Sequence, residues 1–175
     1  AMCFAFFKAD GREVGTSLVD EEGLDAAAAI AAKAQREDRV FELPVDIVVA
    51  PAAEAGAPST VVAADAMPVD QMGLDIGPAT AAAFAARIAG ARTVFWNGPM
   101  GLFEIEDFAA GTRTVGEAVA AGDAVSVVGG GDTVRAVRRF GLEGRITHVS
   151  TGGGAALEFL EGKALPGVVV LMDRE

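Results

Sequence analysis

Three residue types with reactive or metal-binding side chains are almost missing from this chain of 175 residues. It contains one cysteine, one histidine and no tyrosine. With Cys3 as the single cysteine, neither an internal disulfide framework nor a cysteine-based metal site can form within the chain. With His148 as the single histidine, a zinc site of the HExxH kind is excluded, and a Ser-His-Asp triad is possible only through that residue.

Basic side chains are also scarce. The 14 Lys and Arg residues face 25 Asp and Glu residues, which gives a formal charge of −11. This sign is wrong for a surface that binds nucleic acid by releasing counterions. A nucleotide stays possible, because backbone amides, helix N-termini and a bound cation can hold phosphates without many basic side chains.

Long apolar runs and targeting signals are absent from the sequence. No stretch approaches the roughly 18 to 20 apolar residues of a membrane helix, and the first residues have no basic flank or cleavage pattern of a signal peptide. We therefore expect a soluble, cytoplasmic protein that uses neither a membrane nor nucleic acid as a partner.

The residues that are present indicate one globular domain over residues 1–175. Half of them are hydrophobic (51%), glycine (22) far outnumbers proline (7), and no internal repeat or linker divides the chain. The segment 51–58 has the composition of a surface loop. Apolar strands alternate with Ala-rich helices, which favours an α/β protein with a mainly parallel, Rossmann-like three-layer α/β/α sheet, covered by helices on both faces. We expect helices over 25–34, 78–88, 106–119, 133–140 and 154–160, and strands over 47–50, 61–62, 93–96, 124–128, 146–149 and 168–171.

Three glycine-rich turns follow three consecutive predicted strands, and this recurrence is the main functional signal. They are Trp96–Glu104, Gly129–Thr133 and Ser150–Gly154. Because ligands bind at the carboxyl ends of parallel strands, we expect all three turns at one edge of the sheet. Taken singly, the first turn is also compatible with an ordinary strand-to-helix connection.

The second and third turns each precede a predicted helix. Asp132 is either an N-cap of its helix or a Mg²⁺ ligand, since Mg²⁺ prefers one or two carboxylates plus phosphate oxygens. Three successive glycines before Asp132 favour the ligand. The third turn is a candidate anion site at a helix N-terminus. Neither turn fits the GxxxxGK[ST] or GxGxxG pattern. His148 is more typical of a packed or hydrogen-bonded residue than a catalytic one, and Trp96 and the phenylalanines are expected in the core.

Four segments resemble the C-terminal, nucleotide-binding half of the phosphoglycerate kinase family in order and spacing. They are Met72–Pro78, Val94–Glu104, Val128–Thr133 and His148–Gly162. The similarity runs over nearly the whole chain and is weak around 51–67. It implies an enzyme of glycolysis that transfers a phosphoryl group between 1,3-bisphosphoglycerate and ADP, with ATP or ADP as substrate and Mg²⁺ as cofactor.

The resemblance also implies a role for each matching residue. Gly73, Leu74, Gly101 and Leu102 would line the adenine slot, and Glu104 would hold the ribose hydroxyls. Asn97 would reach the phosphates, Pro99, Gly129, Gly130 and Gly131 would also bind the nucleotide, and Asp132 would bind Mg²⁺. Thr133 and the amides of Gly152, Gly153 and Gly154 would stabilise the phosphoryl group in transfer, a reaction that depends on positioning and charge stabilisation.

The family's 3-phosphoglycerate site lies on an N-terminal domain that has no counterpart in this sequence, and the first strand and helix of the nucleotide domain are absent as well. The resemblance therefore implies a fragment truncated at the N-terminus. Two functions follow: part of a phosphotransferase, or a nucleotide-binding module that is inactive without a companion chain. A dehydrogenase domain and a serine hydrolase are disfavoured, because no GxGxxG or GxSxG occurs. Phe4, Phe6 and Phe7 are expected to need a covering surface: a companion chain, a symmetry mate or a rearranged sheet edge.

Overall fold

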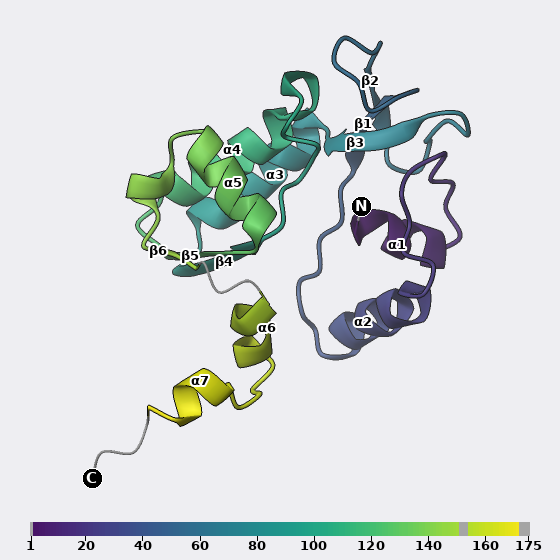
Figure 1. The fold of residues 1–175 in the computed structure, drawn as a ribbon. Coiled ribbons are helices and arrows are strands. Elements are labelled where there is room, and N and C mark those ends of the chain that lie inside the picture. The colour runs from purple at the N-terminus through teal and green to yellow at the C-terminus, as the bar shows by residue number, and fades with distance from the viewer. Residues whose placement is uncertain (1, 151–153, 172–175) are drawn as a thin grey trace. The chain divides into compact units, whose positions relative to one another are not determined.

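The computed structural model describes residues 2–150 and 154–171 and divides them between two units (Figure 1). The first unit takes the chain up to Phe84 and the segment Met100–Thr114. The second takes Ala85–Pro99 and the chain from Val115 onward. Helices α3 (Pro78–Ala89) and α4 (Ala110–Ala121) each contribute residues to both units.

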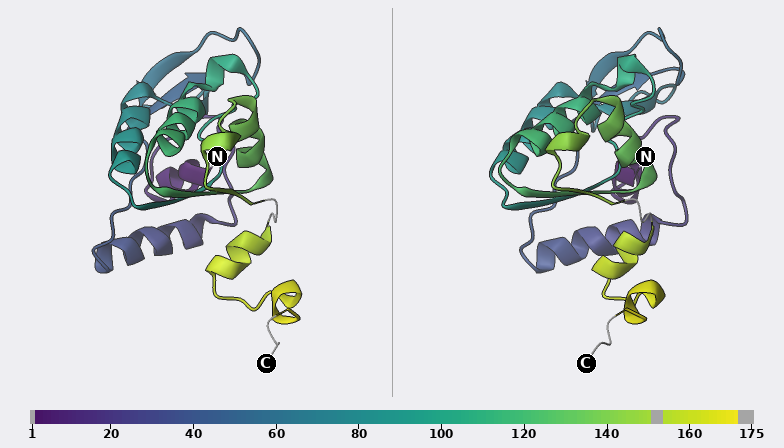
Figure 2. Two further views of the ribbon diagram at one scale, coloured as in Figure 1. Left: turned by 90° about the vertical axis from the view of Figure 1, so that its left-hand side faces the viewer. Right: turned by 60° about the vertical axis from the view of Figure 1, so that its left-hand side comes forward.

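The first unit is built on an antiparallel sheet with strand order β2-β1-β3. Its further elements are α1 (Met2–Ala9), α2 (Leu24–Arg36), β1 (Asp46–Ala50), β2 (Thr60–Ala63), β3 (Met72–Ile76) and the 3₁₀ turn η1 (Glu106–Phe108). Helices α1 and α2 pack side by side, as Figures 1 and 2 show. Our expectation of a mainly parallel sheet therefore does not hold for these three strands.

Helix α1 supplies much of the first unit's core. Phe7 is fully buried and Phe4 is 4% exposed. Their rings meet edge to face and pack with Ile47, Val49 and other apolar residues of the same unit. Phe6 packs against Phe41 with ring centroids 5.0 Å apart. The covering surface that these three rings need is thus part of the chain itself, and neither a companion chain nor a symmetry mate is required for Phe4 and Phe7.

The second unit is built on a parallel sheet with strand order β4-β5-β6. Its elements are β4 (Thr93–Asn97), β5 (Val125–Gly129), α5 (Gly131–Arg139), the 3₁₀ turn η2 (Glu143–Arg145), β6 (His148–Val149), α6 (Gly154–Leu160) and α7 (Pro166–Val169). One face of this sheet is buried, with Trp96 and Ser126. The other face carries Phe95 and Val125, which are exposed, so the predicted cover on both faces is not seen in the described part of the chain.

Most predicted elements are confirmed, and the α/β class is confirmed with them. The exception is 168–171, predicted as a strand: the structure has α7 and a turn there. Pro166 stands in the first turn of α7, where its missing N–H costs nothing. The β-branched run of three valines favours a strand only where a neighbouring strand can pair with it, and the described residues provide none.

A carboxylate from a strand fixes the start of α3. The Asp46 carboxylate accepts hydrogen bonds from the Ala79 amide at 3.0 Å and from the Thr80 amide at 2.8 Å. Desolvation alone would raise the pKa of Asp46, but the bonds from the Thr80 hydroxyl and these amides outweigh it and lower the pKa. The Asp46 carboxylate thus caps helix α3 from a position 33 residues earlier in the sequence than Ala79, and its lowered pKa favours the charged form.

Among the described residues, no helix is both long and apolar enough to cross a bilayer.

Candidate functional site

The first two glycine-rich turns meet at the carboxyl edge of the parallel sheet. Strands β4 and β5 run side by side in register, and their last pair is Asn97 with Gly129. Strand β6 continues the sheet beside β5. The topology therefore confirms that the turns after β4 and β5 share one edge, as three consecutive parallel strands require.

Two glycines at this edge have backbone conformations that other residues rarely adopt. Gly98 has φ +116° and Gly130 has φ +81°. A Cβ on Gly130 would also lie 2.7 Å from Oδ1 of Asn97. The Asn97 side chain therefore lies directly against the second turn, and a side chain at position 130 would disturb it.

Thr133 joins the same two turns from the inside. Its side chain is fully buried, and its Oγ1 accepts a hydrogen bond from the Gly98 N–H at 2.7 Å. That bond uses one lone pair of the hydroxyl oxygen and leaves the hydroxyl hydrogen to another acceptor. Thr133 thus holds the turn after β4 onto the start of α5.

Asp132 does not cap helix α5. The N-cap position belongs to Gly130, which has no side chain that could cap the helix, and Asp132 lies in the first helical turn. Its side chain is exposed and forms an ion pair with Arg135 at 2.8 Å. The capping alternative for Asp132 is therefore wrong, and its carboxylate faces solvent at the positive end of the helix dipole.

A magnesium ion at Asp132 fits the structure only together with phosphate. In the described residues, no group of three or more Asp, Glu, His or Cys side chains is placed to hold a metal ion. Asp132 would be the one protein carboxylate, which suits Mg²⁺ when phosphate oxygens and water supply the other ligands. The side chain of Arg135 would then share or release the carboxylate.

The third turn falls largely outside the described residues. Ser150 is placed: its N–H donates to the carbonyl of Val128 at 2.8 Å, which continues the β5–β6 pairing. Thr151, Gly152 and Gly153 lie outside the described residues, so the predicted phosphate contacts of the Gly152 and Gly153 amides stay predictions. Gly154 is exposed at the start of α6. His148 is exposed in β6, so it is not a packed core residue.

The residues predicted at the adenine belong to the first unit, and two of them, Leu74 and Leu102, meet there. The N–H of Leu102 donates to the carbonyl of Leu74 at 2.8 Å, which places the segment after Met100 beside β3. Gly73 donates its N–H to the Ser17 hydroxyl at 2.9 Å. A Cβ on Gly73 would lie 2.2 Å from the Phe4 ring. One side of Gly73 is thus closed by helix α1.

Two further predicted nucleotide-binding residues, Pro99 and Glu104, lie on either side of the segment 100–102 in the sequence. Pro99 is half-buried in the second unit, and Glu104 is exposed in the first, next to the buried Phe103. Gly101 is packed so tightly that a Cβ would lie 2.3 Å from Oδ1 of Asp75. A side chain at position 101 would therefore disturb the packing of the fold itself.

Asp75 is the residue that sequence reasoning missed. It is 4% exposed in β3, and burial raises its pKa to about 6, although hydrogen bonds from the Gly111 and Ile76 amides oppose the rise. A visible signal was available: an aspartate between Leu74 and Ile76, inside an apolar strand, has no solvent to face. What it bonds to could not be deduced, because Gly111 is 36 residues further along the chain.

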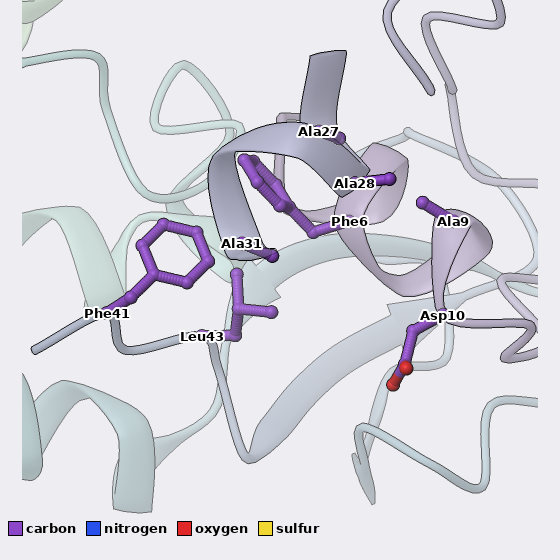
Figure 3. A pocket seen from close by; sticks show the side chains of 8 residues that line it. All are labelled: Phe6, Ala9, Asp10, Ala27, Ala28, Ala31, Phe41 and Leu43. Carbon is purple, nitrogen blue, oxygen red and sulfur yellow. The ribbon is translucent and has the colours of Figure 1, made fainter. Parts of the chain in front are cut away.

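A cavity of about 320 Å³ opens elsewhere in the first unit, between α1, α2 and the segment 41–43 (Figure 3). Its lining is apolar apart from Asp10, which is paired with Arg12 at 2.8 Å. None of the predicted site residues lines it. The cavity is therefore separate from the candidate nucleotide site.

Comparisons with known proteins agree with the family resemblance carried by the four segments between Met72 and Gly162. The family model described as phosphoglycerate kinase matches residues 1–163. The chain is 54% identical over 171 residues to a phosphoglycerate kinase of Salinispora tropica, with 97% of this chain and 42% of the relative covered. It is 55% identical over 175 residues to a phosphoglycerate kinase of Rubrobacter xylanophilus, with 100% of this chain and 44% of the relative covered.

A solved structure of phosphoglycerate kinase from Coxiella burnetii superposes with a TM-score of 0.92 at 46% identity, covering 97% of this chain and 44% of that one. The chain thus spans less than half the length of these similar proteins.

Proposed function

Because the chain belongs to the phosphoglycerate kinase family, we propose that residues 1–175 are its C-terminal, nucleotide-binding domain and hold Mg-ADP or Mg-ATP. The observation that carries the proposal is the shared carboxyl edge of β4 and β5, where Asn97 lies against a glycine turn that opens helix α5. Glycines expose backbone amides there, and the helix dipole favours an anion.

The phosphates of the nucleotide are proposed to lie at the carboxyl edge of β4 and β5. Asn97, Pro99 and the three glycines 129–131 would contact the phosphates. A Cβ on Gly131 would meet nothing within 4 Å, so a ligand has room beside the first turn of α5. Asp132 would hold Mg²⁺, whose chemistry when bound is to neutralise phosphate charge.

The base is proposed to lie against β3 and the segment 101–104. Gly73, Leu74, Gly101 and Leu102 would line the adenine, and Glu104 would accept hydrogen bonds from the ribose hydroxyls. The Leu102–Leu74 hydrogen bond supports this assignment, because it brings two predicted segments together from positions 28 residues apart in the sequence. A purine lies flat between such segments when glycine keeps the backbone bare.

The proposed reaction is the reversible transfer of a phosphoryl group from 1,3-bisphosphoglycerate to ADP, a step of glycolysis in the cytoplasm. Thr133 and the amides of Gly152, Gly153 and Gly154 would stabilise charge on the group in transfer. The 3-phosphoglycerate site would come from an N-terminal domain or a companion chain. Without it, the 175 residues lose the proximity that supplies roughly 7 to 11 kcal/mol of such a barrier.

The alternative function is therefore a nucleotide-binding module with no turnover of its own. The two functions differ in one measurement: phosphoglycerate-dependent turnover of ATP by this chain, without and with an added N-terminal domain of the family. Turnover only with the added domain supports the kinase; Mg-ADP binding without turnover in either case supports the module.

Calorimetric titration with ADP, with and without Mg²⁺, tests the nucleotide site itself. Asp132→Asn should reduce the gain in affinity that Mg²⁺ brings. Asp10→Asn is the matched control, because Asp10 is also exposed and paired with an arginine at 2.8 Å but lies far along the chain from the glycine turns. Equal ADP affinity with and without Mg²⁺ in the unmodified protein would contradict the Asp132 assignment.

A further inference from the structure

Asp75 carries a buried charge that the proposed chemistry does not use. Its Oδ1 accepts the Ile76 N–H at 2.9 Å, and its Oδ2 accepts the Gly111 N–H at 2.7 Å. Burying a carboxylate costs free energy even with two such bonds, which is why the pKa of this group lies above its ordinary value. A carboxylate whose burial costs free energy, and which stands beside the predicted adenine contact Leu74, is a candidate for a positioning role.

The Gly111 bond fixes the first turn of α4 against β3. Gly111 is the second residue of that helix, so Asp75 satisfies an amide that has no partner inside the helix. The fit is tight on two sides: a Cβ on Gly101 or on Gly111 would lie 2.3 Å or 2.4 Å from Oδ1 of Asp75. The carboxylate is thus clamped between β3, the start of α4 and the segment at Gly101.

Thr112, the residue after Gly111, bonds directly to the segment 100–102, which would enclose the adenine. It is fully buried, and its Oγ1 accepts the Met100 N–H at 3.1 Å and the Gly101 N–H at 3.0 Å. The next amide, Leu102, is bonded to Leu74 at 2.8 Å. Three successive amides of the segment 100–102 are therefore held, two by Thr112 and one by the strand that contains Asp75.

We propose that Asp75 and Thr112 are positioning residues for the base of the nucleotide: they set the spacing between Leu74 in β3 and the segment 100–102 that would enclose the adenine. This inference rests on the proposed nucleotide site and adds to it a division of labour. Asp75 and Thr112 act on the base end, because the amides that they bond are those of Ile76, Gly111, Met100 and Gly101, and none of these residues is proposed at the phosphates.

The test compares two probes, Mg-ADP and Mg-tripolyphosphate, by calorimetry on the purified protein. Thr112→Val keeps the shape of the side chain and removes the acceptor oxygen; Thr112→Ser keeps the oxygen. We expect Thr112→Val to weaken ADP binding by about tenfold or more and to change tripolyphosphate binding less than twofold, with Thr112→Ser close to the unmodified protein. Asp75→Asn should behave like Thr112→Val.

Asp46→Asn is the matched control, because Asp46 is also a strand carboxylate that caps a helix of this unit but bonds to no residue of the segment 100–102. It should leave the ratio of the two affinities unchanged. Should Asp75→Asn not fold, the Thr112 pair still decides the matter. Equal losses for both probes, or an unchanged ADP affinity in Thr112→Val, overturn the positioning role. Failure of the unmodified protein to bind ADP overturns the proposed function on which it rests.

Discussion

The free energy of unfolding should contain a component that falls as the pH rises from about 4 to about 6, and the Asp75 carboxyl should be its source. Asp75 has an ordinary pKa of 3.8 when the chain is unfolded and a pKa of about 6 in the fold, because burial disfavours the charged form. The folded protein therefore holds this proton more tightly than the unfolded chain. Its contribution to stability is fully present below about pH 4 and is lost as the pH rises through 6.

The size of the effect follows from the same two values. A rise of the pKa from 3.8 to about 6 corresponds to about 3 kcal/mol, at ~1.36 kcal/mol for each pH unit. The group is 4% exposed, so solvent does not screen it. An asparagine at this position does not titrate. The difference in unfolding free energy between the unmodified protein and Asp75→Asn should therefore shift by about 3 kcal/mol in favour of the variant between pH 4 and pH 7.

Urea unfolding at half-unit pH steps measures this difference, and the ¹³C shift of the Asp75 carboxyl carbon gives its titration midpoint directly. Asp46→Asn is the comparison, because the pKa of Asp46 is lowered and its linked loss of stability falls below pH 4. A carboxyl midpoint at or below pH 4 would refute the reasoning, as would a stability difference between the unmodified protein and Asp75→Asn that is constant from pH 4 to pH 7.

Three further predictions concern packing and backbone. Gly130→Ala should cost about 1 to 3 kcal/mol in chemical unfolding, because φ is +81° and its Cβ would meet a side-chain oxygen at 2.7 Å, whereas Gly131→Ala, with open space around it, should cost less than ~1 kcal/mol. Phe7→Ala should cost about 3 to 5 kcal/mol, against less than ~0.5 kcal/mol for the exposed Met2→Ala; similar values for the two would contradict the helix α1 core. Gly153→Val should lower nucleotide affinity more than the melting temperature, and unchanged affinity would show that this turn only begins a helix.

The elements that could be predicted from the sequence are those whose signals are local. The alanine run of α2 and the apolar runs of β4 and β5 each lie within one short window, and all three formed where expected. The run 168–171 has an equally clear β-branched pattern and became part of α7 and a turn. A strand needs a partner, and a local pattern does not say whether a partner is present.

The candidate site divides in the same way. The glycine turns were visible because Gly98 and Gly130 stand directly after strands and have left-handed backbones that glycine adopts at no steric cost. The bond from Gly98 to Thr133 and the bond from Gly111 to Asp75 were not visible, since they join residues 35 and 36 positions apart. The sequence indicated where a ligand would be bound, and the structure showed what holds that region in place.

By itself, the sequence determined the α/β class, the strand-to-helix turns with their glycines, and an acidic composition with few basic side chains. Only the tertiary structure decided that β1, β2 and β3 pair antiparallel, that the rings of α1 are buried in the chain's own core, and that Asp75 becomes a buried charge. The physical reason is the distance along the chain over which each interaction acts. Helix propensity and backbone φ preference act within a few residues, whereas strand direction, burial and the pKa of a carboxylate depend on which distant segments fill the space around it.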